Sequence, residues 1–424
     1  MKRYKIKPKN SYHYYKSRKN KLRRISIVLI VCSLVMLLFF ITGKLDGAVK
    51  EIVQIISTTT TTSTTTIIPR KSNGKQIKKE PVYLDGSEIT YDLYRLPTVV
   101  KGIYIPASKL DDYEEYITLA QNTSVNAFVI DVKNDAGYLT FSSHNPKLIG
   151  MGCVLDKPPI DDIKTVMNRL YEADIYPIAR IVAFKDNVVG EKFPDRLVKD
   201  KAGNIYTNKA NDTWLNPYDQ RNWEYLLEIS KEAVRAGFKE IQLDYIRFHE
   251  SMNNDTVRLK ADVSKTEIIT AFTKYMHENL KDYGVYVSAD VFGAVITSKV
   301  DSDIVGQDFS ELSKNLDYIC PMVYPSHYAK GTFGIEYPHL DAYGIILRAM
   351  ELAQDEIKKN QRQQRKAIIR PWLQDFTMTK LKPYQPYGEK QIKAQIQGTY
   401  DAGLSEWMFW NASGRYTESG LDDK

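Results

Sequence analysis

Acidic side chains stand near the ends of several apolar segments of this sequence. Residues 239–248 read KEIQLDYIRF, a run that is apolar for most of its length and carries Asp244 near its end. Asp131, Asp290 and Asp375 occupy similar places in other apolar runs. Glycosidic bonds are hydrolysed by two such carboxyl groups: one gives a proton to the leaving oxygen, and the other attacks the anomeric carbon or activates water. Four aspartates brought to one place by folding would be able to do this chemistry.

Polar and aromatic side chains accompany these acids. In a sugar site, aromatic rings stack on the sugar faces, and amide, imidazole and guanidinium groups hold the hydroxyls. The candidates for substrate binding are Asp131, Lys133, Arg180, Trp214, Arg247, Tyr324, His327, Gln374, Trp410 and Asn411.

Each acid also has a purely structural alternative: an ion pair for Asp131 and Asp244, a loop cap or bonds to backbone amides for Asp290, and a structural role for Asp375. Asp244 could pair with Arg247 or Lys133, and Asp131 could pair with Lys133 or Arg180. A carboxylate buried deep and alone would cost several kcal/mol, so we expect each acid to be paired or partly wet.

The strands that must position these residues alternate with helical segments. Residues 219–236, for example, place apolar side chains on one side and are followed by Gly237, a typical residue after a helix end. Eight repeats of strand and helix close into a (β/α)₈ TIM barrel, whose active site lies at the C-terminal ends of the strands. The sequence has no glycine-rich phosphate-binding motif that would favour an open doubly wound sheet. The predicted strands are 99–106, 126–134, 176–184, 239–248, 285–292, 317–325, 366–376 and 404–412, and further helices are predicted at 342–359 and 389–403.

The N-terminal part predicts a membrane anchor. Residues 1–24 are strongly basic, and residues 25–43 form an uncharged apolar run long enough to span the roughly 30 Å hydrocarbon core. The positive-inside rule keeps the N-terminus cytoplasmic and the rest outside; a cleaved signal peptide is the alternative. Residues 44–98, with the run STTTTTSTTT, read as an extracellular stalk. The predicted barrel then occupies 99–412 and a C-terminal tail 413–424.

The distribution of charge and the positions of Cys and His give no support for nucleic-acid binding or for a metal site. Eleven of the 59 Lys and Arg lie in residues 1–24, so the 52 Asp and Glu outnumber the basic residues of the remaining chain. That balance gives no reason to expect binding to nucleic acid. No Cys or His spacing indicates a metal site, and no cofactor is predicted. Cys153 and Cys320 could form a disulfide outside the cell, or remain buried thiols.

Eight segments together resemble a known family. They are GIYIPA, NAFVIDVKNDAG, YPIARIVAFKD, WLNPY, EIQLDYIRF, SADVFG, YICPMVYPSHY and WLQDF, in this order across residues 99–412. The chain resembles a family of bacterial glycoside hydrolases formerly known only as a domain of unknown function, distantly similar to α-amylase-type and galactosidase-type enzymes. The resemblance implies a TIM barrel and hydrolysis of a glycan.

The resemblance to the α-amylase clan also implies roles for three acids. Asp244 on the fourth strand would be the nucleophile, Asp290 on the fifth the acid, and Asp375 on the seventh a third carboxylate. The sequence departs from that clan in two ways: its fifth-strand acid is Asp instead of Glu, and Gln242 stands where the clan has an arginine. Galactosidase-like enzymes take their general acid from another strand, so a resemblance to them would make Asp131 or Asp375 the candidate for that role.

The sequence thus predicts a single-pass, outward-facing glycoside hydrolase of a cell-wall or surface polysaccharide. Its composition, rich in Lys, Ile, Asn and Tyr, suggests a Gram-positive bacterium. The nearest alternative is a non-catalytic polysaccharide-binding barrel that tethers or senses the wall. A scaffold acting through its outer helices is a third possibility, although no protein partner is predicted.

Overall fold

The computed structural model describes residues 99–260, 262–359 and 367–422. The predicted basic tail 1–24, membrane span 25–43 and stalk 44–98 lie outside these residues. Within the described ranges, no helix combines the length and the apolar character needed to cross a bilayer.

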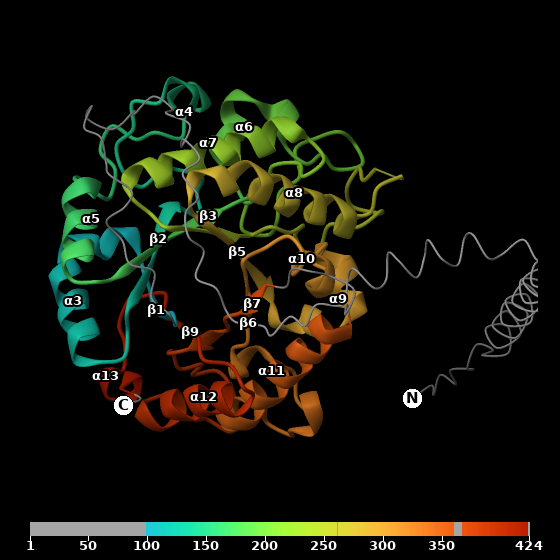
Figure 1. Cartoon of the computed structure of the whole chain (residues 1–424). Helices are drawn as coiled ribbons and strands as arrows, with labels where there is room; N and C mark the ends of the chain where they lie inside the picture. Colours follow the sequence, from blue (N-terminus) through green and yellow to red (C-terminus); the bar gives the residue numbers. More distant parts are fainter. Residues whose placement is uncertain (1–98, 261, 360–366, 423–424) are drawn as a thin grey trace, which may run out of the picture. The chain divides into compact units, whose positions relative to one another are not determined.

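The strands form one closed parallel barrel surrounded by helices (Figure 1). Neighbouring strands follow the order β5-β4-β3-β2-β1-β9-β8-β6-β7, and pairing of β5 with β6 closes the sheet. Each strand lies within one of the eight predicted segments, so the predicted (β/α)₈ barrel is confirmed. The strands are β1 (Lys101–Ile105), β2 (Ala127–Lys133), β3 (Tyr176–Val182), β4 (Glu240–Asp244), β5 (Tyr286–Phe292), β6 (Tyr318–Met322), β7 (Ile368–Ile369), β8 (Trp372–Gln374) and β9 (Trp407–Trp410).

The count of nine strands arises because the seventh predicted strand is in two pieces. Strands β7 and β8 are separated by Arg370 and Pro371. Proline has no N–H for the ladder, so it interrupts the hydrogen bonding of the strand without changing its path.

The helices lie outside the strands, and the predicted helices agree closely with the observed ones; that predicted at 389–403 ends two residues earlier, at Asp401. Helix α7 has Asp219 as its N-cap, accepting from the backbone N–H of Arg221, and ends at Gly237, whose φ of 108° is left-handed. The predicted helix 342–359 is α11 without change. The helices are α3 (Tyr113–Asn122), α4 (Pro146–Met151), α5 (Ile163–Glu172), α6 (Val189–Lys192), α7 (Gln220–Ala236), α8 (Lys265–Leu280), α9 (Lys299–Val305), α10 (Phe309–Leu312), α11 (Ala342–Lys359), α12 (Glu389–Asp401) and α13 (Glu418–Leu421).

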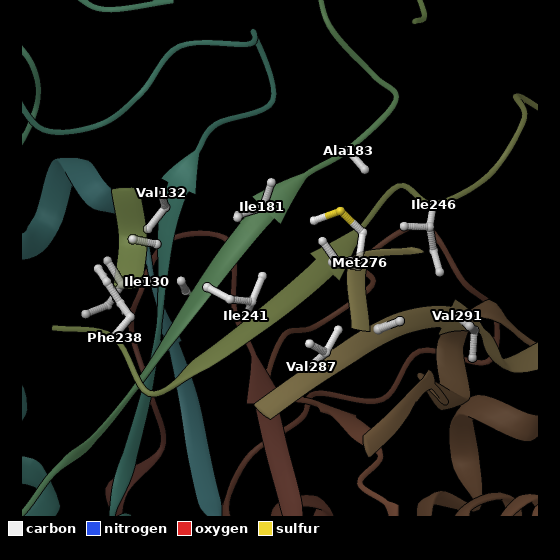
Figure 2. Packing of buried hydrophobic residues seen from close by; sticks show 14 of the residues in the cluster. Ile130, Val132, Ile181, Ala183, Phe238, Ile241, Ile246, Met276, Val287 and Val291 are labelled. Atoms are coloured by element: carbon white, nitrogen blue, oxygen red, sulfur yellow. The ribbon is translucent and has the colours of Figure 1, made fainter. Parts of the chain in front are cut away.

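Most of the apolar core lies between the strands and the helices. Ile181, Ile241 and Val287, from three neighbouring strands, pack in one cluster with Met276 of α8 (Figure 2). Because strand side chains alternate, the residues on either side of Ile241 must point into the barrel instead. This alternation decides which side chains can reach the active face.

The interior of the barrel is unusually polar at its N-terminal end. Arg370 is fully buried and donates to Glu240 of β4 at 2.9 Å and to Glu406 at 2.7 Å. Tyr176 of β3 also donates to Glu240, at 3.2 Å. A buried arginine shared by two glutamates therefore closes the bottom of the barrel and leaves the upper end for the other polar side chains.

The segment after β9 packs back against the barrel. Residues after β9 return to the barrel, where the Tyr416 hydroxyl donates to the backbone oxygens of Tyr104 and Phe409.

Cys153 and Cys320 are both buried free thiols, so the expected alternative of a disulfide between them is wrong.

Candidate active site

The ends of β4 and β5 place Asp244 and Asp290 side by side. Leu243 is paired with Ala289 in the parallel ladder, so the two aspartates that follow are next in register. Paired residues of neighbouring parallel strands lie about 4.8 Å apart and point to the same side of the sheet. Both aspartates are buried and belong to the interior face. The barrel thus brings together two of the three predicted catalytic acids.

Arg180 of β3 is the counterion of this end of the barrel. Its Nη2 and Nε donate to Asp244 Oδ2 at 2.6 and 2.9 Å, and its Nη1 donates to Asp131 Oδ1 at 2.7 Å. A second, longer contact joins Nη1 to Asp135 at 3.4 Å. The carboxylates of Asp244 and Asp131 therefore flank one guanidinium, and the ion-pair alternative for Asp131 with Arg180 is the one found.

Asp131 also accepts a hydrogen bond from Tyr104 of β1, at 2.6 Å. Burial raises the pKa of Asp131, while the charge of Arg180 acts in the opposite direction. The pKa of Tyr104 is raised as well, by burial first and then by the charge of Asp131. The phenol is therefore a neutral donor at physiological pH.

Asp290 lies deeper and has neutral partners. Its Oδ1 accepts from the Gln242 amide at 2.8 Å and from the Trp372 indole at 2.7 Å. Burial raises the pKa of Asp290 well above its ordinary value, and the nearby charge of Asp244 raises it further. A carboxyl group with a raised pKa beside a second carboxyl group is an arrangement that suits general acid catalysis.

The raised pKa of Asp290 predicts a pH-dependent change in stability for Asp290→Asn. The native state holds this proton more tightly than the unfolded chain, so the contribution of Asp290 is full below the unfolded pKa of about 3.9 and is lost as pH rises through the raised native pKa. Asn keeps the acceptor oxygen and cannot ionise. We expect the free energy of unfolding of the variant, relative to wild type, to rise with pH across that window. Urea unfolding at a series of pH values measures it; a difference that is constant or falls with pH would contradict the assignment.

Aromatic side chains border the acids on two sides. Trp410 stacks on Tyr104 with ring centroids 4.0 Å apart, and Arg180 lies 5.3 Å from the Trp410 centroid. On the other side, Tyr324 packs edge-on against His327 and Phe376. Burial raises the pKa of the Tyr324 phenol, and negative charge from the carboxylates at this end of the barrel adds to the rise.

Arg247 is held by rings and not by Asp244. Its guanidinium lies 4.5, 4.9 and 5.2 Å from the ring centroids of Phe292, Tyr245 and Trp214. Its ion-pair partner is Glu250, at 3.2 Å, so the expected alternative of an Asp244–Arg247 pair is wrong.

Tyr245, directly after Asp244, has a strained backbone. Its φ of 51° is left-handed, a region that residues other than glycine seldom adopt. In this conformation its backbone N–H donates to Asp244 Oδ1 at 2.6 Å. Backbone strain of this kind concentrates at functional sites, where the surrounding structure maintains it.

Three predicted site residues have all or most of their polar atoms engaged by the protein. Lys133 is fully buried and binds Asp186 at 2.9 Å and the backbone oxygens of Val182 and Lys185. Gln374 and Asn411 stabilise loops. The Gln374 amide forms hydrogen bonds with backbone atoms of residues 326 and 376. The Asn411 amide does so with backbone atoms of residues 375, 413 and 415.

Asp375 lies in a different environment from Asp244 and Asp290. Both of its carboxylate oxygens accept from Thr417, at 2.7 Å from the backbone N–H and 2.9 Å from the hydroxyl. Burial raises the pKa of Asp375, and the bonds from Thr417 act against that rise. Its carboxylate thus holds the segment that follows β9.

Several residues of this site were not among the predicted candidates. Tyr104, Asp135 and Tyr245 contact Arg180 or Asp244 directly. Tyr104 stands one position before the end of β1 and faces inward, so alternation along that strand could have identified it. The described residues contain no group of three or more His, Cys, Asp or Glu side chains placed to hold a metal ion.

Comparison with known proteins agrees with this architecture. A family model described as "Putative glycosyl hydrolase domain" matches residues 102–416. No curated protein matches the chain. The crystal structure of a hypothetical protein from Ruminiclostridium thermocellum is 37% identical, covering 45% of this chain and 97% of that one, with a TM-score of 0.41.

A second solved structure shares the fold. The glycoside hydrolase domain of PgaB (BpsB) from Bordetella bronchiseptica is 11% identical, with a TM-score of 0.55, covering 77% of this chain and 99% of that one. At this identity the similarity shows the barrel alone, whereas the family model spans nearly the whole described chain. The chain has a TIM-barrel fold and belongs to the family that this model defines, that of the "Putative glycosyl hydrolase domain".

Proposed function

We propose that this protein hydrolyses a cell-wall or surface polysaccharide by a two-carboxylate, retaining mechanism, with Asp244 as nucleophile and Asp290 as acid. The observation that carries the proposal is the register of β4 and β5, which sets the two aspartates next to each other on the interior face. A separation of about 5–5.5 Å between the carboxyl groups suits direct attack on the sugar, while inverting enzymes need a wider gap for water.

Asp290 is suited to give the first proton. Its raised pKa favours the protonated form of the carboxyl group, and both of its hydrogen bonds fall on Oδ1. The acidic proton is therefore assigned to Oδ2. As Asp244 bonds to the anomeric carbon, the glycosidic C–O bond breaks and this proton passes to the leaving oxygen. Asp290, now a carboxylate, takes a proton from the water that releases the sugar from Asp244.

Arg180 and Tyr245 position the nucleophile. The guanidinium binds Oδ2 through two nitrogens and the backbone N–H of residue 245 binds Oδ1. These bonds fix the plane of the Asp244 carboxylate toward the sugar. Asp131, on the far side of Arg180, holds the guanidinium in place. Trp410 and Tyr324 supply ring faces for the sugar.

The location rests on the sequence of the N-terminal part. The basic residues 1–24 and the apolar run 25–43 favour an anchor with the barrel outside the cell, joined through the threonine-rich residues 44–98. An outward barrel would meet wall and surface glycans directly.

The experiment uses intact cells that produce the full-length chain, supplied with purified Gram-positive wall polysaccharide. We expect intact cells and lysed cells to release reducing ends from the supplied polysaccharide at the same rate. Release only after lysis would contradict the outward orientation. Binding of the polysaccharide without any release would contradict the hydrolase proposal and favour a non-catalytic, wall-tethering barrel.

A further inference from the structure

A pocket beside the active face is formed by the loops that follow β4 and β5. It has a volume of about 580 Å³ and lies between helix α9 and the residues 250–260 and 263–265 that follow β4. These loops continue from the strands that carry Asp244 and Asp290, so the pocket lies on the same side of the barrel as the acids. Its lining is part apolar and part polar, which suits a sugar better than a purely apolar ligand.

Two lysines of this pocket lack an ion-pair partner within the described chain. Lys260 and Lys265 both line it, and neither forms an ion pair with a carboxylate among the described residues. The Lys265 ammonium donates to the backbone oxygens of Met252 and Ile304 and lies 5.3 Å from the ring centroid of Phe248. Two backbone carbonyls and a ring hold the ammonium in place without neutralising it.

The acids of the pocket are engaged by other cations. Glu250 pairs with Arg247 at 3.2 Å, and Asp303 pairs with Lys299 at 2.8 Å. Glu267, near the pocket, accepts from the backbone N–H of Ser264 as part of a capping box. Asp262 and Glu267 lie near Tyr218 of the lining, but neither forms an ion pair with Lys260 or Lys265 among the described residues. The two ammonium groups therefore remain available to bind an anionic ligand directly.

Neutral recognition groups surround the lysines. Tyr218 presents a ring, with the Lys260 ammonium 5.7 Å from its centroid, and Asn253 and Asn254 supply amides. Rings, amides and ammonium groups together recognise a sugar that carries an acidic group.

A chain of contacts links this pocket to the catalytic acids. Glu250 lines the pocket and binds Arg247, whose guanidinium packs on Tyr245, the residue after Asp244. A polysaccharide bound at Asp244 and running over Arg247 would reach Lys260 and Lys265. We infer that this pocket is a distal subsite for a carboxylate- or phosphate-bearing segment of the polysaccharide, an inference that rests on the proposed function.

Binding without turnover tests the inference. The probes are tetragalacturonate, a glycerol phosphate oligomer and neutral cellotetraose, titrated calorimetrically into the full-length chain carrying Asp244→Asn. We expect at least one anionic probe to bind ten or more times as tightly as cellotetraose, and to weaken as salt rises. Preference for the uronate identifies a carboxylate glycan, and preference for the other oligomer identifies a phosphodiester glycan.

The lysine variants locate the site. Lys260→Gln with Lys265→Gln should reduce the affinity for the anionic probe to that for cellotetraose. Lys358→Gln with Lys393→Gln, which removes the same charge from exposed helices, should leave it unchanged. If the double variant does not fold, Lys260→Gln alone should weaken anionic binding at least threefold, because Lys260 is exposed.

Two results overturn the inference: equal binding of anionic and neutral probes, or anionic binding that the pocket lysines do not affect. A failure of the hydrolase proposal can be distinguished from a failure of this inference. A wild-type chain that releases no reducing ends but binds acidic oligosaccharides through Lys260 would lose the enzyme function and keep this subsite.

Discussion

Asp244→Asn should lower the rate of polysaccharide hydrolysis by a factor on the order of 10⁴ or more, the scale seen when a nucleophile is removed from a catalytic unit. Asn is nearly isosteric with Asp but cannot form the glycosyl ester. Its side-chain oxygen can still accept from Arg180 or from the backbone N–H of Tyr245, so the fold should persist. Release of reducing ends measures the effect, and circular dichroism confirms that the variant is folded.

The matched control is Asp375→Asn. This residue also lies at the end of a barrel strand, but its carboxylate accepts from Thr417 in the segment after β9, whereas the Asp244 carboxylate accepts from Arg180 and is next to Asp290 in register. We expect the control to retain most of the activity and to lose stability instead, since Asn can accept only one of the two bonds well. Equal losses of activity in the two variants would contradict the distinct roles, and an active Asp244→Asn would remove Asp244 from the chemistry.

Arg370→Met should reduce the free energy of unfolding by about 3–5 kcal/mol, the usual effect of removing one partner of a buried ion pair. Arg370 and Glu240 have no exposed side-chain surface, and Glu406 is nearly as buried. Without the guanidinium, two glutamates remain inside the barrel with no cation. Urea unfolding of the full-length chain measures the change.

A triple variant separates charge from packing in this network. Arg370→Met combined with Glu240→Gln and Glu406→Gln removes all three charges while keeping similar volumes. Because replacing a whole buried ion network is often neutral, the triple variant should be more stable than the single one. If the single and triple variants unfold alike, the loss comes from packing and the electrostatic explanation fails.

The sequence was sufficient to predict the barrel because its strands have a simple pattern. Each of the eight segments is a short apolar run between turn residues, and the observed strands fall within all eight. The sequence also indicates which end of each strand carries the polar residues, and so places Asp131, Arg180, Asp244 and Asp290 at the same end.

The partner of each polar residue could not be predicted in the same way. Asp244 binds Arg180 of the neighbouring strand, and not Arg247 three residues further along the chain. The register partners of Asp244 and Arg180 are Val182 and Gln242, so the long arginine side chain reaches diagonally across the barrel interior. Lys133 also has a partner other than the expected Asp131 or Asp244, because its long side chain reaches the buried Asp186 on the loop after β3. Spacing along one strand does not contain this information.

The stereochemistry of hydrolysis tests the central claim most directly, because it depends on the distance between Asp244 and Asp290. Proton nuclear magnetic resonance of the first sugars released from the polysaccharide reports their anomeric configuration before mutarotation. Aspartates adjacent in register favour the short separation of carboxyl groups that direct attack on the sugar needs, so we expect the configuration of the substrate to be retained. Inversion would show that water attacks directly and would contradict the assignment of these two residues as nucleophile and acid.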